Sequence, residues 1–241
     1  MRLFIILLLF FFKHNIVYSD PIYNLIKIPN LEVYDIKNDN GIKYLNANKN
    51  FSIGVENNIK CNKSNKKNLN SKFSLISKNL QIYDKEFLKK INLRFIVLCE
   101  NLYISEINTA GIPDYKNRTL ILDINFNKKY FERVIHHEIF HMIHDSYKEI
   151  FDEKFWSKLN DKTFKYSECS TCSDRLGLDL YDETKGFLTE YSKSIASEDM
   201  AEIYSFLITD KINIKMKAKK DPILFNKILY IESNINSIIN F

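Results

Sequence analysis

Glycine, proline and tryptophan are scarce in this chain, whose 241 residues include 5 Gly, 4 Pro and 1 Trp. So little glycine and proline excludes a collagen-like repeat, and a hydrophobic content of 45% excludes a wholly disordered chain. Basic residues exceed acidic residues only slightly, 35 against 30, so the strong positive charge typical of nucleic-acid-binding proteins is missing. We expect a folded chain with a substantial core and no nucleic-acid partner.

Long apolar runs are missing except near the N-terminus. Leu3 to Phe12 is apolar without interruption, but its ten residues span only about 15 Å as a helix, half of a membrane core. Ser19 then ends a short stretch that suits cleavage. We predict a signal peptide over 1–19, a secreted or periplasmic protein, and no stable membrane span after cleavage. An uncleaved membrane anchor is the alternative.

Only four cysteines are present, Cys61, Cys99, Cys169 and Cys172, and the sequence does not decide among their three pairings. Export would allow them to form disulfides. The CxxC spacing of Cys169 and Cys172 is compatible with a disulfide or with half of a zinc site. A second CxxC is missing and no histidine is near, so we predict a local or cross-linked disulfide here.

Composition changes along the chain. Residues 20–70 form a polar segment rich in Asn and Lys, and 61–71 within it is expected to be a linker or exposed loop. From residue 71 onward, apolar periodicity predicts regular elements. They are a helical stretch over 73–88, strands over 94–99 and 119–125, a turn at 111–114, and helices over 130–145, 197–208 (capped by Ser197) and from Pro222. This order predicts an α+β fold with a small sheet and helices on one side, in a domain over 71–241.

Histidine is concentrated in one place, because four of the five lie between residues 136 and 144. His137-Glu138-Ile-Phe-His141 is the HExxH pattern. On a helix, residues four apart share a side and lie about 6 Å apart along the axis, so both imidazoles can reach one metal ion. Glu138 then lies beside the metal, where it can deprotonate a metal-bound water. The alternative is a helix whose histidines bind nothing.

The two other histidines of this segment are not predicted to bind the metal. His136 points about 100° away from His137 and is predicted to make a packing contact. His144 shares the side of His137 but lies about 10 Å along the axis, too far to join the same tetrahedral site. It is either a support for the ligands or an ordinary core histidine.

A catalytic zinc needs a third protein ligand, and downstream carboxylates or thiolates are the remaining donors. Glu198 and Glu202 are four apart on a predicted helix, so one can bind the metal while the other orients a ligating imidazole. An ordinary acidic first turn is the alternative. Tyr191 is the candidate donor to a developing oxyanion, and a packing tyrosine is the alternative.

Several segments together resemble a known family. They are Ile135-His-His-Glu-Ile-Phe-His141, Phe155-Trp-Ser-Lys-Leu-Asn160 with Phe164-Lys-Tyr166, Gly186-Phe-Leu-Thr-Glu-Tyr191, and Ser197-Glu-Asp-Met-Ala-Glu202. They resemble the zinc-binding metallopeptidases of secreted bacterial proteins, which are similar to gluzincins. The spacing from Tyr191 to Glu202 also resembles the catalytic domain of anthrax lethal factor. The resemblance covers about 72–210 and implies a zincin-like metallopeptidase fold.

The resemblance also implies roles for individual residues. His137, His141 and Glu198 would bind one zinc ion, and Glu138 would be the general base. Tyr191 would stabilise the oxyanion and Glu202 would support a ligand. The family often has an acidic residue where His144 stands, and the Cys169/Cys172 insert is not part of the matched pattern.

These observations predict an exported zinc metallopeptidase that hydrolyses peptide or protein substrates. The strand over 119–125 is expected to bind an extended peptide by strand addition. The alternative is a secreted, non-catalytic binding protein that contains zinc, which a fourth protein ligand such as Cys169 or His144 would mark.

Overall fold

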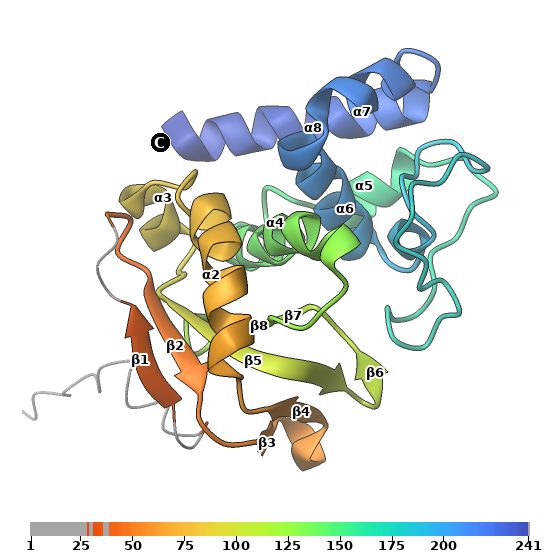
Figure 1. Ribbon diagram of the computed structural model, residues 1–241. Helices are drawn as coiled ribbons and strands as arrows, with labels where there is room; N and C mark the ends of the chain where they lie inside the picture. Colours follow the sequence, from red (N-terminus) through yellow and green to blue (C-terminus); the bar gives the residue numbers. More distant parts are fainter. Residues whose placement is uncertain (1–27, 29–30, 36–38, 241) are drawn as a thin grey trace, which may run out of the picture.

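The computed structural model describes residues 28, 31–35 and 39–240. The signal peptide predicted over 1–19 lies outside these residues. A mixed β-sheet occupies one side of the molecule, and helices cover one of its faces and extend beyond it (Figure 1). The α+β prediction is therefore confirmed.

The sheet is larger than the sequence predicts, because eight strands take part. They are β1 (Leu31–Asp35), β2 (Lys43–Ala47), β3 (Phe51–Ile53), β4 (Ile59–Asn62), β5 (Phe95–Ile104), β6 (Ile107–Asn108), β7 (Gly111–Asp114) and β8 (Thr119–Asp123). The first four come from the polar segment 20–70. Its many Asn and Lys residues conceal the alternation that strands require.

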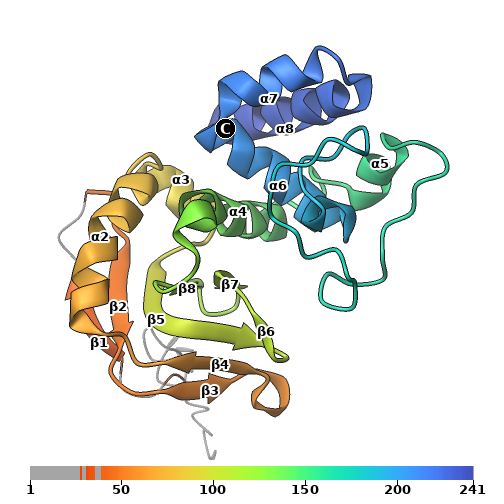
Figure 2. The same ribbon diagram turned by 45° about the vertical axis from the view of Figure 1, so that its right-hand side comes forward.

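Strand β5 is the centre of the sheet and has two differently paired halves. Its first half runs parallel to β2 on one side and to β8 on the other. Its second half pairs antiparallel with β4 and with β6. Antiparallel β1 and β7 flank β2 and β8, so β7 is an edge strand of the described sheet. This edge lies below helix α4 (Lys128–Ser146), as Figure 2 shows.

The first half of β5 is apolar without alternation because both of its faces are buried. Ile96 and Leu98 belong to the larger core, which lies between the sheet and the helices. Val97 and Cys99 point to the opposite face, where a second core includes Phe51. The two cores hold β5 and its neighbours in a fixed position below the helices.

Helices α2, α3 and α4 cover one face of the sheet, and the remaining helices pack outside α4 (Figures 1 and 2). Besides α4, they are α2 (Lys66–Leu80), α3 (Lys85–Lys90), α5 (Glu153–Lys158), α6 (Ala196–Thr209), α7 (Lys211–Ala218) and α8 (Pro222–Asn240). Short 3-10 helices are η2 (Val55–Asn57) and η3 (Tyr191–Lys193). No helix in the described part of the chain has the length and apolarity to cross a bilayer.

Helix boundaries follow from local capping. The Asn127 side chain accepts a hydrogen bond from the backbone of Lys129 and begins α4 slightly before the predicted start. Pro222 opens α8 as predicted, with the Asp221 carboxylate accepting from the two N–H groups that follow the proline. The Ser197 cap is wrong, because α6 begins earlier, at Ala196, without a side-chain cap.

Two other expectations are also wrong. The linker predicted over 61–71 contains the end of β4 and the start of α2, whose Asn65 side chain caps the helix. The turn predicted at 111–114 is strand β7, which pairs with β8 along its whole length. Single strands of four residues with glycine and proline carry too little pattern to be recognised alone.

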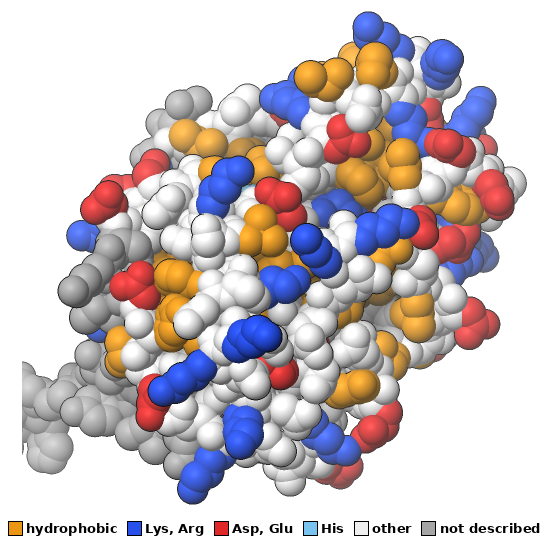
Figure 3. All heavy atoms as spheres, in the orientation of Figure 1, with side chains coloured by type: hydrophobic (Ala, Val, Ile, Leu, Met, Phe, Trp, Pro, Cys, Tyr) orange, Lys and Arg blue, Asp and Glu red, His pale blue; other side chains and the backbone are white. Residues whose placement is uncertain are grey.

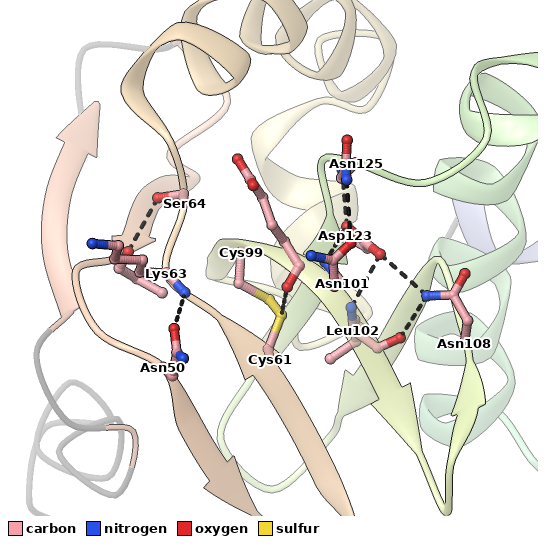
Figure 4. The surroundings of a disulfide bond; sticks show 12 residues. Asn50, Cys61, Lys63, Ser64, Cys99, Asn101, Leu102, Asn108, Asp123 and Asn125 are labelled. Atoms are coloured by element: carbon pink, nitrogen blue, oxygen red, sulfur yellow. Dashed lines mark hydrogen bonds between the residues drawn. A yellow bond between two sulfur atoms is a disulfide. The ribbon is translucent and has the colours of Figure 1, made fainter.

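The structure pairs Cys61 with Cys99, which joins β4 to β5 (Figure 4). Beside this bond, the Asp123 carboxylate at the end of β8 accepts from the backbone N–H groups of Asn101 (2.9 Å) and Leu102 (3.0 Å). Figure 4 shows Asp123 facing the point where β5 passes from its parallel half to its antiparallel half. These contacts fix the point from which the chain enters α4.

Charged groups of both signs are interspersed on the face shown in Figure 3. Apolar side chains are exposed among them. The exposed apolar residues of the described chain include Ile212 and Met216 of α7.

Candidate metal centre

Helices α4 and α6 pack against each other (Figure 1). Their facing sides bring three potential metal ligands together. His137 and His141 come from α4, and Glu198 comes from the first turn of α6. The Nε2 atoms of the two histidines lie 3.1 Å apart. The Glu198 Oε2 atom lies 2.8 Å from Nε2 of His137 and 3.1 Å from Nε2 of His141. The three atoms therefore converge on one point.

Helical spacing explains this convergence. His137 and His141 are one turn apart on α4, as are Glu198 and Glu202 on α6, so each pair shares a side of its helix. Apolar neighbours such as Ile139 are fully buried and fix the rotation of α4 against its surroundings. All four polar side chains are buried where the two helices meet.

This donor set fits a zinc ion. Two imidazoles and one carboxylate are the protein ligands of many catalytic zinc sites, which keep a fourth position open. Ligand atoms held tetrahedrally at about 2.0–2.1 Å from zinc lie about 3.3 Å from one another. The observed separations of 2.8 to 3.1 Å are close to that spacing. Three buried acceptor atoms facing one another need a cation or protons between them.

The electrostatics of the cluster favour a positive charge at this point. Burial opposes protonation of His137, but its hydrogen bonds to Glu198 and Glu202 and their negative charges raise its pKa to about 10. Burial opposes ionisation of Glu198, but the neighbouring His141 and His137 hold the pKa of this carboxyl far below its ordinary value. The ionised carboxylates therefore attract a cation to the cluster.

Glu202 orients His137 from behind. Its Oε1 atom accepts from Nδ1 of His137 at 2.9 Å, which leaves Nε2 free to bind metal. Its Oε2 atom accepts from Arg133 and from the hydroxyl of Thr189, the latter at 2.8 Å. Although burial raises the pKa of Glu202, the Arg133 charge and these hydrogen bonds lower it overall, so Glu202 stays ionised.

Glu138 lies beside the three ligand atoms and lines the same cavity. Burial raises the pKa of its carboxyl, and the charges of Glu198 and Glu202 act in the same direction, against the two histidines. On its other side is Gly111 of β7, where a Cβ atom would lie 2.5 Å from Cγ of Glu138. The absence of a side chain at residue 111 therefore makes room for the Glu138 carboxylate.

Two tyrosines line the cavity as well. The Tyr191 ring lies 5.9 Å from the His137 ring, centroid to centroid. Burial and the charges of the nearby Glu198 and Glu138 raise the Tyr191 pKa well above its ordinary value. Burial and the Glu138 charge likewise raise the pKa of Tyr115. Both phenols therefore keep their protons and are hydrogen-bond donors at neutral pH.

The cavity that contains these groups has a volume of about 500 Å³. Edge strand β7 forms one wall, and a long loop between α5 and α6 forms another through residues that include Ser170, Leu176 and Leu178. A volume of this size is in the range of ligand and substrate sites.

A comparison with known families agrees with this geometry. Residues 72–221 match a family described as putative zinc-binding metallo-peptidase. This chain belongs to that family. Among curated proteins, none is similar enough to count as a match. Membership in a metallopeptidase family implies a peptide or protein substrate, and the His137, His141 and Glu198 cluster is its candidate metal site.

The other predicted site residues of this family member lie at or near the cavity. His144 also lines it, but its Nε2 atom bonds the Phe151 carbonyl at 3.2 Å and lies 3.6 Å from the Glu153 carboxylate, away from the ligand cluster. His136 faces the opposite side of α4. There its Nδ1 accepts from the Tyr83 hydroxyl at 2.8 Å, and burial lowers its pKa to about 4.

Cys169 and Cys172 are joined to each other, so neither supplies a thiolate to a metal. In the part of the chain that the structure describes, the only cluster of three metal-ligating groups is the one formed by His137, His141 and Glu198. A fourth protein ligand, which would mark a structural zinc, is not part of it.

Several residues of the site were not predicted from the sequence. Arg133, Thr189 and Gly111 contact the predicted residues only through tertiary packing. A second buried cluster was also missed, in which Oδ2 of Asp199 accepts from Nζ of Lys227 at 2.6 Å. Arg133 could have been found from the sequence, because it precedes His137 by one helical turn and therefore lies on the same side of α4.

Proposed function

We propose that this chain is an exported, zinc-dependent peptidase that hydrolyses peptide bonds. The observation that carries this proposal is the convergence of His137, His141 and Glu198 on one point, with Glu138 beside them in a cavity. When bound there, a zinc ion would polarise the scissile carbonyl and make a water molecule more acidic.

Glu138 is the general base of the proposed reaction. It accepts a proton from the attacking water and delivers it to the nitrogen of the leaving amine. Burial and neighbouring carboxylates raise its pKa, which brings the group closer to the value that suits proton transfer near neutral pH. Gly111 keeps the space in which this carboxylate lies.

Tyr191 donates a hydrogen bond to the oxygen of the tetrahedral intermediate as negative charge develops on it. Its raised pKa supports this role, because the phenol remains protonated. Tyr115 lines the same cavity with a raised pKa and is the second candidate donor. Separate Tyr191→Phe and Tyr115→Phe variants assign the role, since the true donor lowers kcat about 10²- to 10³-fold.

Edge strand β7, rather than β8, is the element that can bind an extended peptide. The expectation for β8 is wrong, because β8 is paired with β5 and with β7. The Asp123 N–H donates to the Ala110 carbonyl at 2.9 Å, so the backbone groups of Ala110 point toward β8. In an antiparallel ladder this direction repeats at every second residue, so the backbone N–H and carbonyl of Ile112 point toward β8 as well. The N–H of Gly111 and the carbonyl of Pro113 then face the open edge, where a substrate strand can pair.

Export is proposed from the sequence over 1–19 and is supported by the two disulfides. Structural disulfides form and persist in secreted and periplasmic proteins and are rare in the cytosol.

The test compares zinc content and hydrolysis of a mixed peptide pool for the wild type and Glu138→Gln. We expect Glu138→Gln to keep zinc and lose about 10²- to 10⁴-fold in rate. His141→Ala should lose both zinc and activity. Glu132→Gln, an exposed change on the same helix, is the matched control and should resemble the wild type.

Full activity of Glu138→Gln would end this mechanism. A wild type that retains zinc but cleaves no peptide would instead support the non-catalytic, zinc-containing binding protein.

A further inference from the structure

Arg133 of α4 is a buried side chain whose guanidinium bonds two separate parts of the candidate site. Its Nη1 atom donates to Oε2 of Glu202, and the other oxygen of Glu202 holds Nδ1 of His137 at 2.9 Å. Its Nη2 atom donates to the Leu178 carbonyl at 2.7 Å. Leu178 lines the cavity, so a single guanidinium connects a metal ligand to a wall of the cavity.

The wall at Leu178 belongs to the irregular loop between α5 and α6, so contacts with the helices must hold its position. Beside the Arg133 contact, the Asp179 carboxylate accepts from Lys129 and, at 3.0 Å, from the Tyr130 hydroxyl. Lys129 and Asp179 are exposed, so their ion pair contributes little. The buried Arg133 is therefore the main attachment of this wall to the helix that carries both histidine ligands.

The shape of the guanidinium makes it a mechanical link between its two acceptors. The group is planar and rigid, so a shift of one hydrogen-bonded end moves the other. The Phe206 ring of α6, whose centroid lies 4.4 Å from Cζ of Arg133, restricts its movement further. A lysine would keep the positive charge but has one nitrogen in place of the fork. The double contact is therefore specific to arginine.

On the basis of the proposed function, we propose that Arg133 is a positioning residue that couples metal binding at His137 to the position of the cavity wall at Leu178. A metal ion on Nε2 of His137 fixes the ring, the ring fixes Glu202, and Glu202 fixes the guanidinium. The guanidinium then holds the Leu178 carbonyl. Coupling between two sites is reciprocal, so a wall held in place strengthens metal binding by the same factor.

The test measures hydrogen exchange of residues 176–181 in the full chain, with and without zinc. In the wild type we expect zinc to slow this exchange about five- to tenfold, a coupling of ordinary size. Helix α7, which packs on α8, is the internal reference and should exchange at the same rate in both states. In Arg133→Lys the segment should exchange faster and should no longer respond to zinc. Its zinc affinity, measured by competition with a chelator, should fall about 10- to 100-fold.

Two control variants each change one side of the connection and leave Arg133 in place. Thr189→Val removes a hydrogen bond of 2.8 Å to the same Glu202 oxygen, so zinc affinity should fall while the wall still responds to zinc. Tyr130→Phe removes a contact with Asp179, so the wall should exchange faster but should still be slowed by zinc. Only Arg133→Lys should abolish the response.

Steady-state kinetics give a second readout of the wall. At saturating zinc, Arg133→Lys should raise KM on the order of tenfold and change kcat less than about threefold, because the wall has moved while the metal ligands are filled. Thr189→Val should leave KM within about twofold of the wild type under the same conditions.

Two results would overturn the coupling: exchange of residues 176–181 that is independent of zinc in the wild type, or an equal response to zinc in Arg133→Lys. Unchanged zinc affinity in Arg133→Lys would overturn it too. The wild-type measurement is decisive even if Arg133→Lys does not fold. If the wild type binds zinc but cleaves no peptide, the proposed function fails, while hydrogen exchange still decides the coupling. A wild type that binds no zinc would end both.

Discussion

On α4 and on α6, one residue belongs to the candidate metal cluster in the cavity, and its neighbour in sequence belongs to a hydrogen-bond network in the core. We call the first the open cluster and the second the closed networks. His137 of α4 and Glu198 of α6 face the cavity. Their sequence neighbours, His136 and Asp199, face away from it. Tyr83 and Asn79 bond the two ring nitrogens of His136. All four side chains are buried, so burial alone does not distinguish the site.

The difference lies in how hydrogen-bond donors and acceptors are matched. In the closed network around Asp199, one carboxylate oxygen accepts from Lys227, Trp156 and Tyr166 at 2.5 to 2.8 Å. In the open cluster, two imidazole nitrogens and one carboxylate oxygen face one another, and a cation or protons between them would satisfy them. An acceptor without a donor is not by itself the sign of a metal site, because Oδ1 of Asp199 is buried without a partner too. The structural sign of the candidate metal site is the convergence of three ligand atoms on one point.

The largest effect that we expect to distinguish the Asp199 network from the open cluster is a loss of stability. Lys227→Met leaves the Asp199 charge buried without its cation, so we expect the free energy of unfolding to fall by about 3–5 kcal/mol. Zinc content per folded molecule should not change. Urea unfolding and metal analysis measure both, and the exposed Lys219→Met is the control. Loss of zinc from folded Lys227→Met would contradict the separation of the two clusters.

A smaller effect is expected from the residue that links His137 to its surroundings. Glu202→Gln weakens the acceptor that holds the His137 ring, and we expect zinc affinity to fall about 10- to 100-fold. Competition with a chelator measures the affinity. Glu190→Gln, whose carboxylate bonds Lys193 instead, should leave it unchanged. An unaltered affinity in Glu202→Gln would mean that the ring orientation does not depend on this contact.

His136 provides the converse test. His136→Gln disturbs hydrogen bonds with Tyr83 and Asn79, so unfolding should become easier by about 1–3 kcal/mol. Zinc stoichiometry and the rate of hydrolysis should be maintained in the folded protein. A variant that folds but has lost its metal would show that both sides of α4 serve the site.

The smallest effect concerns alkaline pH and the network around His136, in which the Tyr204 hydroxyl donates to the Tyr83 hydroxyl at 3.2 Å. Burial raises the pKa of Tyr204 to about 12, against about 10 in an unfolded chain. Above pH 10 the unfolded chain therefore loses this proton first, and stability decreases as pH rises. At pH 11 this difference in the pKa of Tyr204 lowers the free energy of unfolding by about 1.4 kcal/mol.

Unfolding of the wild type and Tyr204→Phe between pH 8 and 11 measures this effect. The stability difference between them should be constant below pH 9 and should narrow by that amount at pH 11. Curves that stay parallel throughout would contradict a raised pKa for Tyr204.

Sequence periodicity was sufficient for the elements that carry the ligands. Two residues four apart on a helix lie on one side of it, so the pairing of His137 with His141 follows from spacing alone. The position of α6 relative to α4 does not follow from spacing. The choice of Glu198 rather than Glu202 as the metal ligand came from the family resemblance. In the structure, the Glu198 carboxylate lies at the Nε2 atoms of both histidines, whereas the Glu202 carboxylate lies at Nδ1 of His137.

What the sequence could not predict depends on contacts between distant segments. The strands before residue 63 were missed because Asn and Lys side chains occupy many of their positions. Gly111 was taken for a turn, although its backbone lies against Glu138. Lys227 follows no local pattern, because its partner Asp199 lies 28 residues earlier in the chain.

The Cys61–Cys99 bond has a consequence for any cleavage of this chain by a protease. A nick anywhere between residues 62 and 98 produces two fragments that remain covalently tethered, so β4 stays beside β5. A nick before Cys61, or between Cys99 and Cys169, produces fragments that no disulfide joins. Gel mobility with and without reductant would therefore distinguish a chain nicked between residues 62 and 98, whose fragments separate only after reduction, from a chain nicked before Cys61 or between Cys99 and Cys169.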